Sequence, residues 1–299
     1  MRAFSYLTAK GQPRIGIEVD GKKLDFTYIW QIFKDLKNSP QTPDLYFLQI
    51  MIEMENFSDS VINEVLDELR KYRKLDDLVI KGDIRFDVPI TRPSKIICLG
   101  RNYAAHAEEW KSKVPEKPMF FSKLPSCLLP TQGQIRIPEG IGRVDHEIEL
   151  AVVIGKRAKY VREHRAMEYV AGYTIANDVT ARAMQGDCIK NGNPWTLPKG
   201  MDTFLPMGPW LIPADAIADP HDLELELKVN GETRQKSSTA DMVFKIPQLI
   251  EYITRYITLE VGDIICTGTP EGTLPIVPGD LIEASITGLG TLSNTVIAE

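Results

Sequence analysis

Residues 145–155 have the sequence Asp145-His-Glu-Ile-Glu-Leu-Ala-Val-Val-Ile-Gly155, in which alternating acidic residues lead into an apolar segment. Side chains two positions apart in a β-strand lie on the same face of the sheet. The segment therefore predicts a strand on which Asp145, Glu147 and Glu149 share one face. Carboxylates placed so close together repel one another when they lose water, and a divalent cation is the most compact counter-charge.

The chemistry of these side chains narrows the choice of metal. Oxygen ligands without soft partners favour Mg²⁺, Mn²⁺ or Ca²⁺ over Zn²⁺. Glu147 and Glu149 alone would equally suit a solvent-exposed strand face. A third carboxylate, Asp178, ends the apolar segment Tyr173-Thr-Ile-Ala-Asn-Asp-Val-Thr180 just before a predicted helix. That position is typical of a helix N-cap and also of a ligand, so both interpretations of Asp178 stay open.

Strand patterns dominate the chain beyond residue 93. Short apolar or alternating segments predict further strands at 95–100, 223–229, 263–267 and 281–286. Asn230-Gly231 predicts a hairpin turn after one of these strands. Helical periodicity is confined to 163–169, 181–189 and 246–256. The fold class that follows is α+β and strand-rich.

The first 88 residues form a different kind of segment. Asp20-Gly21 lies between two alternating segments and predicts a hairpin, and apolar residues between 45 and 69 recur at helical spacing. The proline-flanked segment Phe86-Asp-Val-Pro-Ile-Thr-Arg-Pro93 predicts an extended connector. We therefore expect a small α+β N-terminal domain at 1–88, without catalytic groups, and a catalytic domain at 89–299.

A second candidate for chemistry lies in Leu99-Gly-Arg-Asn-Tyr-Ala-Ala-His-Ala-Glu-Glu109, which predicts a strand, a glycine turn and a short helix. His106 and Glu109 are three residues apart and therefore adjacent on the helix surface. A carboxylate beside an imidazole fixes its tautomer and raises its basicity, which suits proton transfer near neutral pH. An ordinary surface ion pair would have the same spacing. The prolines and lysines of residues 111–118 predict an exposed, mobile lid.

Composition excludes several classes of protein. The 299 residues carry a formal net charge of -6, so a basic surface for nucleic acid is not expected. The apolar segments are far shorter than the roughly 20 residues of a membrane span. Residues 1–16 do not resemble a signal peptide, which predicts a cytoplasmic protein. The four cysteines are widely spaced, and we expect reduced thiols without a disulfide or zinc site.

Taken together, these segments resemble the fumarylacetoacetate hydrolase family over roughly residues 94 to 297. The motifs that carry the resemblance are 100–106 with Glu109, 145–155, Gly172-Tyr-Thr-Ile-Ala-Asn-Asp-Val-Thr-Ala-Arg182, Gln185, Trp195-Thr-Leu-Pro-Lys199, Val229-Asn-Gly-Glu-Thr-Arg-Gln235 and Thr267-Gly-Thr-Pro-Glu-Gly272. Their order along the chain agrees with that of the family. The boundary of the resemblance also agrees with the proline-flanked connector.

The resemblance implies a fold and a metal site. The catalytic domain is expected to be a mixed β-sandwich roll that forms homodimers. Mg²⁺ or Mn²⁺ is expected on Glu147, Glu149 and Asp178, whereas Asp145 is not a usual ligand in the family. His106 and Glu109 are expected to form a dyad that activates water, on a lid that orders over the ligand.

The resemblance also implies how the substrate is bound. Gln185, Lys199 and Thr269 match residues that contact the oxo-acid end of the substrate. Lys199 would add positive charge where an enolate develops, which makes it a third catalytic residue beside the dyad. We further predict substrate binding by residues of the same motifs, namely Arg101, Tyr103 and Arg182.

The function predicted from the sequence is a Mg²⁺- or Mn²⁺-dependent enzyme acting on a small 2-oxo acid. Hydrolysis of a C–C bond in an acylpyruvate, such as fumarylpyruvate, is the preferred reaction. Oxaloacetate decarboxylation and the isomerisation or decarboxylation of hydroxymuconate-type diacids are the enzymatic alternatives. A metal-dependent oxo-acid binding protein is the non-enzymatic alternative, against which the presence of both dyad residues argues.

Overall fold

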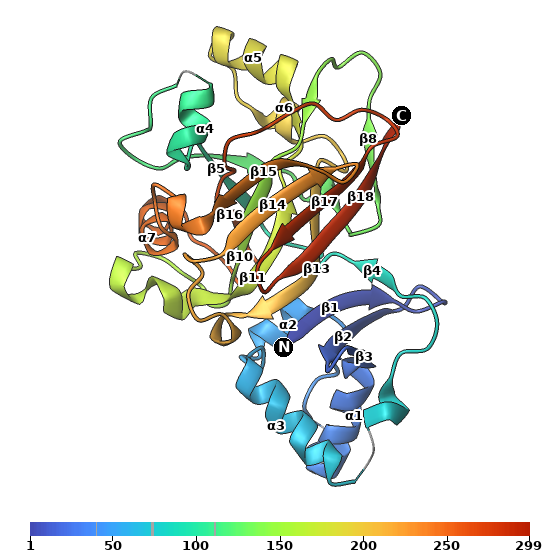
Figure 1. Ribbon diagram of the computed structural model, residues 1–299. Helices are drawn as coiled ribbons and strands as arrows, with labels where there is room; N and C mark the ends of the chain where they lie inside the picture. Colours follow the sequence, from blue (N-terminus) through green and yellow to red (C-terminus); the bar gives the residue numbers. More distant parts are fainter. Residues whose placement is uncertain (40, 73–74, 111) are drawn as a thin grey trace.

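Two β-sheets packed face to face form the framework of the protein, as the computed structural model shows for residues 1–39, 41–72, 75–110 and 112–299 (Figure 1). Within these residues, the larger sheet is eleven-stranded, and its main path runs β3 (Lys22–Asp25), β2 (Pro13–Val19), β1 (Arg2–Leu7), β13 (Leu205–Pro213), β11 (Val170–Asn177), β10 (Ile148–Ile154), β16 (Ile264–Cys266), β5 (Ile96–Gly100), β6 (Met119–Lys123). Off this path, β4 (Arg85–Asp87) pairs with β1, and β7 (Leu128–Leu129) pairs with β13.

The second sheet covers one face of the first. Its strand order is β15 (Glu232–Ser238), β14 (Glu224–Val229), β17 (Leu281–Ile286), β18 (Gly290–Ala298), β8 (Gln134–Ile137). A short pair, β9 (Val144–Asp145) with β12 (Thr180–Ala181), lies beside the strand ends that carry the acidic residues. These mixed sheets confirm the predicted strand-rich α+β class.

Helices lie at both ends of this sandwich. The α-helices are α1 (Phe26–Leu36), α2 (Leu48–Glu53), α3 (Asp59–Arg70), α4 (Ala104–Glu109), α5 (Arg182–Asn191), α6 (Thr196–Lys199) and α7 (Ile246–Tyr256). The 3₁₀ helices are Leu75–Leu78, Pro125–Cys127, Glu163–Tyr169, Ala214–Ala216 and Thr239–Asp241. Figure 1 shows α4, α5 and α6 at the end opposite to α1 and α3. No helix in the described part of the chain has the length and apolar character needed to span a bilayer.

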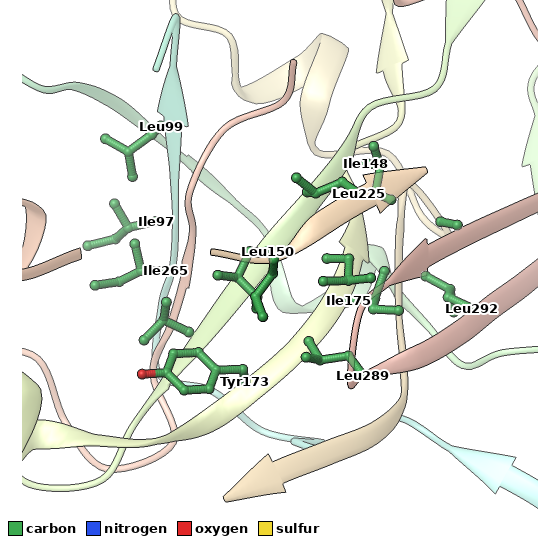
Figure 2. Close-up of a cluster of buried hydrophobic side chains, with 14 of the residues drawn as sticks. Ile97, Leu99, Ile148, Leu150, Tyr173, Ile175, Leu225, Ile265, Leu289 and Leu292 are labelled. Atoms are coloured by element: carbon green, nitrogen blue, oxygen red, sulfur yellow. The ribbon is translucent and has the colours of Figure 1, made fainter. Parts of the chain in front are cut away.

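The core between the sheets follows from the alternation of β10. Ile148, Leu150, Val152 and Ile154 are all buried in this core, whereas Ala151 and Val153 belong to a second cluster on the opposite face. Figure 2 shows side chains of β10 and β11 together with Leu225 and Leu292 of the second sheet. Each such side chain contributes about 1.5–3 kcal/mol on burial. β10 therefore contributes side chains to both core clusters, one on each face of the larger sheet.

Residues 1–88 extend the larger sheet. Ala3 of β1 is paired with Leu211 of β13, so the N-terminal strands continue the sheet of the catalytic part. The second core cluster joins apolar side chains of α1, α2 and α3 to Ala151, Val153 and other residues beyond 88. The two predicted parts thus share a sheet and a core, and their independence as domains stays a prediction.

The two predicted hairpins are present with the backbone that their sequences favour. Asp20 and Gly21 have φ values of 50° and 75°, and Asn230 and Gly231 have 53° and 81°. Consecutive positive φ angles define the type I′ turn, which asparagine, aspartate and glycine tolerate best. These turns set the registers of β2 with β3 and of β14 with β15.

His221 couples the stability of the fold to pH. Its Nε2 accepts a hydrogen bond of 3.1 Å from the N–H of Ile246, the first residue of α7, and its Nδ1 lies 3.3 Å from Asp219. Burial lowers the pKa of His221 below its ordinary 6.5, and Asp219 only partly opposes this. The unfolded chain therefore binds this proton more readily, so we expect stability to fall as the pH drops below 6.5. Chemical denaturation between pH 5 and 8 should show a smaller loss in His221→Gln; an equal loss would contradict the assignment.

Candidate functional site

Three buried carboxylates meet where β10 and β11 lie side by side. Glu149 lies in β10, Glu147 immediately precedes it, and Asp178 immediately follows β11. The antiparallel register places Ile148 opposite Asn177, and the N–H of Asp178 donates to the carbonyl oxygen of Glu147 (2.8 Å). One oxygen of each carboxylate lies within 4.8 Å of the others. Two segments some 30 residues apart in the chain thus make one cluster, with oxygen atoms only.

The structure decides between the interpretations that the sequence left open. Glu147 and Glu149 are only 5% and 1% exposed, so they do not form a solvated strand face. The N-cap of α5 is Ala181, without a side-chain hydrogen bond, so Asp178 does not cap this helix. Burial of three like charges in one place has a high free-energy cost unless cations lie beside them.

Two lysines and an arginine provide part of that positive charge. The Nζ of Lys199 donates to Glu147 Oε2 (2.8 Å) and to Asp178 Oδ2 (2.7 Å). The Nζ of Lys123 lies 2.7 Å from the other oxygen of Asp178, and Arg182 donates to Glu147 Oε1. Burial opposes the charge of both Glu147 and Lys199, but their ion pairs lower the pKa of Glu147 and raise that of Lys199. Both side chains therefore stay charged.

Glu149 has no such partner. Its Oε2 accepts one hydrogen bond, from the N–H of Gly268 (2.8 Å), and no cationic side chain among the described residues forms an ion pair with it. Burial, together with the negative charges of Asp178 and Glu147, raises the pKa of Glu149 well above its ordinary value. A divalent cation between the three carboxylates would provide the charge that Glu149 lacks. The donor set therefore fits Mg²⁺ or Mn²⁺, which prefer oxygen ligands.

Asp145 has a different environment from the other carboxylates of its segment. It is completely buried and accepts hydrogen bonds from Arg143 Nε (2.7 Å) and Arg182 Nε (2.7 Å). It is not part of the cluster of carboxylate oxygens, and its exclusion as a metal ligand stays a prediction. Asp145 instead holds the guanidinium of Arg182 between itself and Glu147.

A cavity of about 240 Å³ opens beside the cluster. Its polar lining residues include Arg101, His106, Glu147, Arg182, Gln185, Lys199 and Thr269. Apolar lining residues include Leu99, Trp110, Phe121, Ile189 and Trp195. The structure thus gathers most of the predicted catalytic and substrate-binding residues around one space. Glu109 and Tyr103 are not part of the lining: Glu109 reaches the cavity only through its contact with His106. Tyr103 is buried, and its hydroxyl has no hydrogen-bond partner within the described residues.

The predicted dyad lies on α4 and lines this cavity through His106. The Nδ1 of His106 is 3.3 Å from Glu109 Oε2, and the N–H of Gly272 donates to Glu109 Oε1 (3.2 Å). Burial lowers the pKa of His106 although the nearby carboxylates oppose it, so the imidazole is neutral at pH 7. A neutral ring that donates from Nδ1 to Glu109 keeps Nε2 as a proton acceptor.

The end of α4 is held against the site. The indole N–H of Trp110 donates to Thr273 Oγ1 (3.3 Å), and its ring centre is 4.8 Å from the Arg182 guanidinium. Lys111, part of the predicted lid, lies outside the described residues. The mobility of this lid stays a prediction.

Three residues of the site had no role predicted from the sequence. The side-chain amide of Gln235 donates to Thr269 Oγ1 (2.8 Å), and its Oε1 accepts from the N–H of Ile148 (3.1 Å). Lys123 and Arg143 complete the charge pairs described above. Gln235 lies within one of the motifs that carry the family resemblance, so a role in the site could have been predicted for it from the sequence. Nothing in the sequence around Lys123 distinguishes a buried lysine from a solvated one.

Comparison with known proteins agrees with this arrangement. Residues 95–297 match the family described as fumarylacetoacetate (FAA) hydrolase C-terminal. The chain is 50% identical over 196 residues to the mitochondrial oxaloacetate tautomerase FAHD1 of Arabidopsis thaliana, covering 66% of this chain and 87% of the relative. It is 43% identical over 224 residues to the mitochondrial oxaloacetate tautomerase FAHD2A of Bos taurus, covering 73% and 71% respectively.

Solved structures show the same architecture. The maleylpyruvate hydrolase of Sphingobium sp. SYK-6, in complex with manganese(II) and pyruvate, gives a TM-score of 0.77 at 30% identity, covering 100% of this chain and 99% of that one. The fumarylpyruvate hydrolase of Pseudomonas aeruginosa, in complex with Mn²⁺ and pyruvate, gives 0.67 at 34% identity, covering 74% and 94%. Proteins similar to this chain thus include oxaloacetate tautomerases, a maleylpyruvate hydrolase and a fumarylpyruvate hydrolase.

Proposed function

Because the chain belongs to the fumarylacetoacetate hydrolase family, we propose that it is a Mg²⁺- or Mn²⁺-dependent enzyme that tautomerises a small 2-oxo acid of the oxaloacetate class. The observation that carries the proposal is the position of His106, which lines the same cavity as Glu147 and Lys199 and contacts Glu109 through its Nδ1. The names of the FAHD1 and FAHD2A relatives support the reaction, and the Mn²⁺–pyruvate complexes of the two hydrolases support the cofactor and the 2-oxo acid.

The proposed metal ligands are Glu147, Glu149 and Asp178. An ion held there would polarise the oxo group of the substrate as a Lewis acid. We propose substrate contacts for the cavity-lining residues Arg182, Gln185 and Thr269. Tyr103 is not placed to make such a contact, because its side chain lies outside the cavity lining.

Proton transfer would be carried out by the dyad. Keto–enol exchange moves one proton between the carbon beside the oxo group and the oxygen, so the proton that His106 takes from one of these atoms is returned to the other, in either direction. When Nδ1 of His106 carries a proton and donates it to Glu109, Nε2 is free to accept the substrate proton. Glu109 then stabilises the imidazolium that forms. The Lys199 ammonium would stabilise the negative charge that develops on the oxygen.

Hydrolysis of an acylpyruvate is the second candidate. It is favoured by the position of Glu109, whose side chain is 33% exposed, so that the dyad can receive a water molecule from solvent. The same imidazole would then take a proton from water in place of carbon. Decarboxylation of oxaloacetate would need no base, and none of the contacts among the described residues favours it over the other two reactions.

A substrate panel tests the proposal. We expect the Mg²⁺- or Mn²⁺-loaded protein to accelerate enol-to-keto conversion of oxaloacetate, measured by the loss of enol absorbance. Acetylpyruvate and fumarylpyruvate should be cleaved more slowly, if at all. Cleavage of acylpyruvates without effect on oxaloacetate would make hydrolysis the function. Homodimer formation and the cellular location stay predictions that this panel does not address.

Lys199 should oppose metal binding while supporting turnover. Its ammonium contacts one oxygen of Glu147 and one of Asp178, two of the three proposed metal ligands. Removing one positive charge a few ångströms away should tighten Mn²⁺ binding on the order of 10-fold in Lys199→Met, measured by calorimetry. Turnover should fall by about 10²–10³-fold, since the enolate loses its cation. The exposed Lys236→Met is the control; weaker Mn²⁺ binding in Lys199→Met would contradict the competition.

A further inference from the structure

We propose that Arg101 binds the second carboxylate of a dicarboxylic 2-oxo acid, and that it selects dicarboxylates over monocarboxylates. This inference rests on the proposed function of the same cavity. It assigns to one residue the recognition of the substrate carboxylate that the metal site does not bind.

The first argument comes from the charges around the cavity. Of its lining residues with permanent positive charge, Arg182 is bound by Asp145 and Glu147, and Lys199 is bound by Glu147 and Asp178. Arg101 makes neither an ion pair nor a side-chain hydrogen bond with any residue that the structure describes. It is therefore the cavity cation whose charge is left for a ligand.

The second argument comes from the surroundings of Arg101. Much of the remaining lining is apolar, with the side chains of Leu99, Trp110, Phe121 and Trp195. The acidic residue of the lining, Glu147, is already bound by Arg182 and Lys199. A bound ligand would remove water from Arg101, and a guanidinium without a counter-ion loses more free energy there than one that pairs with a carboxylate.

The third argument is that the backbone holds Arg101 in an uncommon conformation. Its φ of 58° lies in the left-handed region that residues other than glycine rarely adopt. The next residue, Asn102, anchors the turn: its side-chain amide donates to the carbonyl oxygens of Thr267 (2.8 Å) and Phe244 (3.1 Å). Its Oδ1 accepts from the N–H of Phe244 (2.8 Å). The turn is thus fixed before a ligand arrives, which lowers the entropic cost of binding.

These observations define the ligand by its chemistry. One end, an oxo group next to a carboxylate, suits the metal cluster. The other end should carry a second carboxylate, which a guanidinium binds with two parallel hydrogen bonds. A neutral tail such as a methyl group would leave Arg101 without an anion. The inference therefore favours short 2-oxo dicarboxylates over pyruvate and acetylpyruvate.

The test compares two ligand classes in the Mn²⁺-loaded protein. Binding of pyruvate is measured by calorimetry, and tautomerisation of oxaloacetate by kcat and KM. In Arg101→Met we expect kcat/KM for oxaloacetate to fall about 10- to 100-fold, mainly through KM, as expected for loss of a charged hydrogen-bonded pair. The Kd for pyruvate should stay within about twofold. Arg101→Lys should restore part of the loss, and the exposed Arg92→Met serves as the control.

Each outcome has a separate meaning. Unchanged oxaloacetate kinetics in Arg101→Met, or equal weakening of pyruvate and oxaloacetate, would overturn the role of Arg101 while the proposed function stands. Failure of the wild-type protein to bind either acid would overturn the proposed function and the assignment with it. Thermal unfolding of the variants should match the wild type, since the side chain of Arg101 has no partner to lose within the described residues.

Discussion

Replacing Glu149 by glutamine should abolish binding of Mn²⁺ and Mg²⁺, and with it all metal-dependent turnover, while making the metal-free protein more stable. Glu149 is buried beside Glu147 and Asp178 and lacks a cationic partner among the described residues. Burial and the neighbouring carboxylates raise the pKa of Glu149, so placing this carboxyl group here costs free energy in the metal-free protein, and a neutral amide of the same shape removes that cost. With metal, the same charge is needed as a ligand.

Opposite changes in two measurements make this prediction specific. Calorimetry with Mn²⁺ should detect no binding in Glu149→Gln at concentrations that saturate the wild type. The Tm of the metal-free variant should rise by a few degrees, since about 1 kcal/mol corresponds to ~2–4 °C in a chain of roughly this size. The exposed Glu224→Gln should change neither quantity. Retained metal binding in Glu149→Gln, or a lower Tm, would show that Glu149 does not have this role.

Replacing His106 by alanine should lower kcat for oxaloacetate tautomerisation by about 10²–10⁴-fold, the contribution of general base catalysis. The Kd for Mn²⁺ should change little, because His106 is not one of the three clustered carboxylates. Glu109→Gln should have a smaller effect, since Glu109 acts only through His106, which it orients and whose positive charge it stabilises. The neighbouring exposed residue gives a matched control, Glu108→Gln, which should leave kcat unchanged.

The same variant distinguishes the reactions that the family carries out. Tautomerisation and hydrolysis both need the proton acceptor and should both fall in His106→Ala. Metal-driven decarboxylation of oxaloacetate requires no base and should be affected less. A variant that keeps full tautomerase activity would contradict the assignment of His106, even if the protein proved to be metal-dependent. Stopped-flow absorbance for the enol and enzymatic detection of pyruvate separate these signals.

Local sequence patterns were sufficient for the secondary structure near the site. The alternation of residues 145–155 predicted which side chains of β10 share a face, because this property depends only on the two-residue period of a strand. The Asn230-Gly231 hairpin and the helix at 246–256 were predicted for the same reason, as turn preferences and helical periodicity act within a few residues. The spacing of His106 and Glu109 likewise predicted their contact on α4.

Contacts between distant segments required the tertiary structure. The register of β11 against β10 brings Asp178 to Glu147 and excludes it from capping α5. No local pattern predicts that Lys123, at the end of β6, is buried against Asp178. The position of Tyr103 outside the cavity also depends on packing that its motif does not specify.

Local patterns were thus enough to predict the strand-rich class, the alternation of side chains along β10 and the pairing of His106 with Glu109. The predicted strand is interrupted after Asp145, so Asp145, Glu147 and Glu149 do not lie on one continuous strand. The sharing of charges required the tertiary structure: Arg182 and Lys199 are bound by carboxylates, whereas Glu149 has no cationic partner and Arg101 no anionic one among the described residues. The physical reason is that periodicity is set by neighbouring residues. Burial and charge pairing depend on which strands lie together, and segments far apart in the chain decide that jointly.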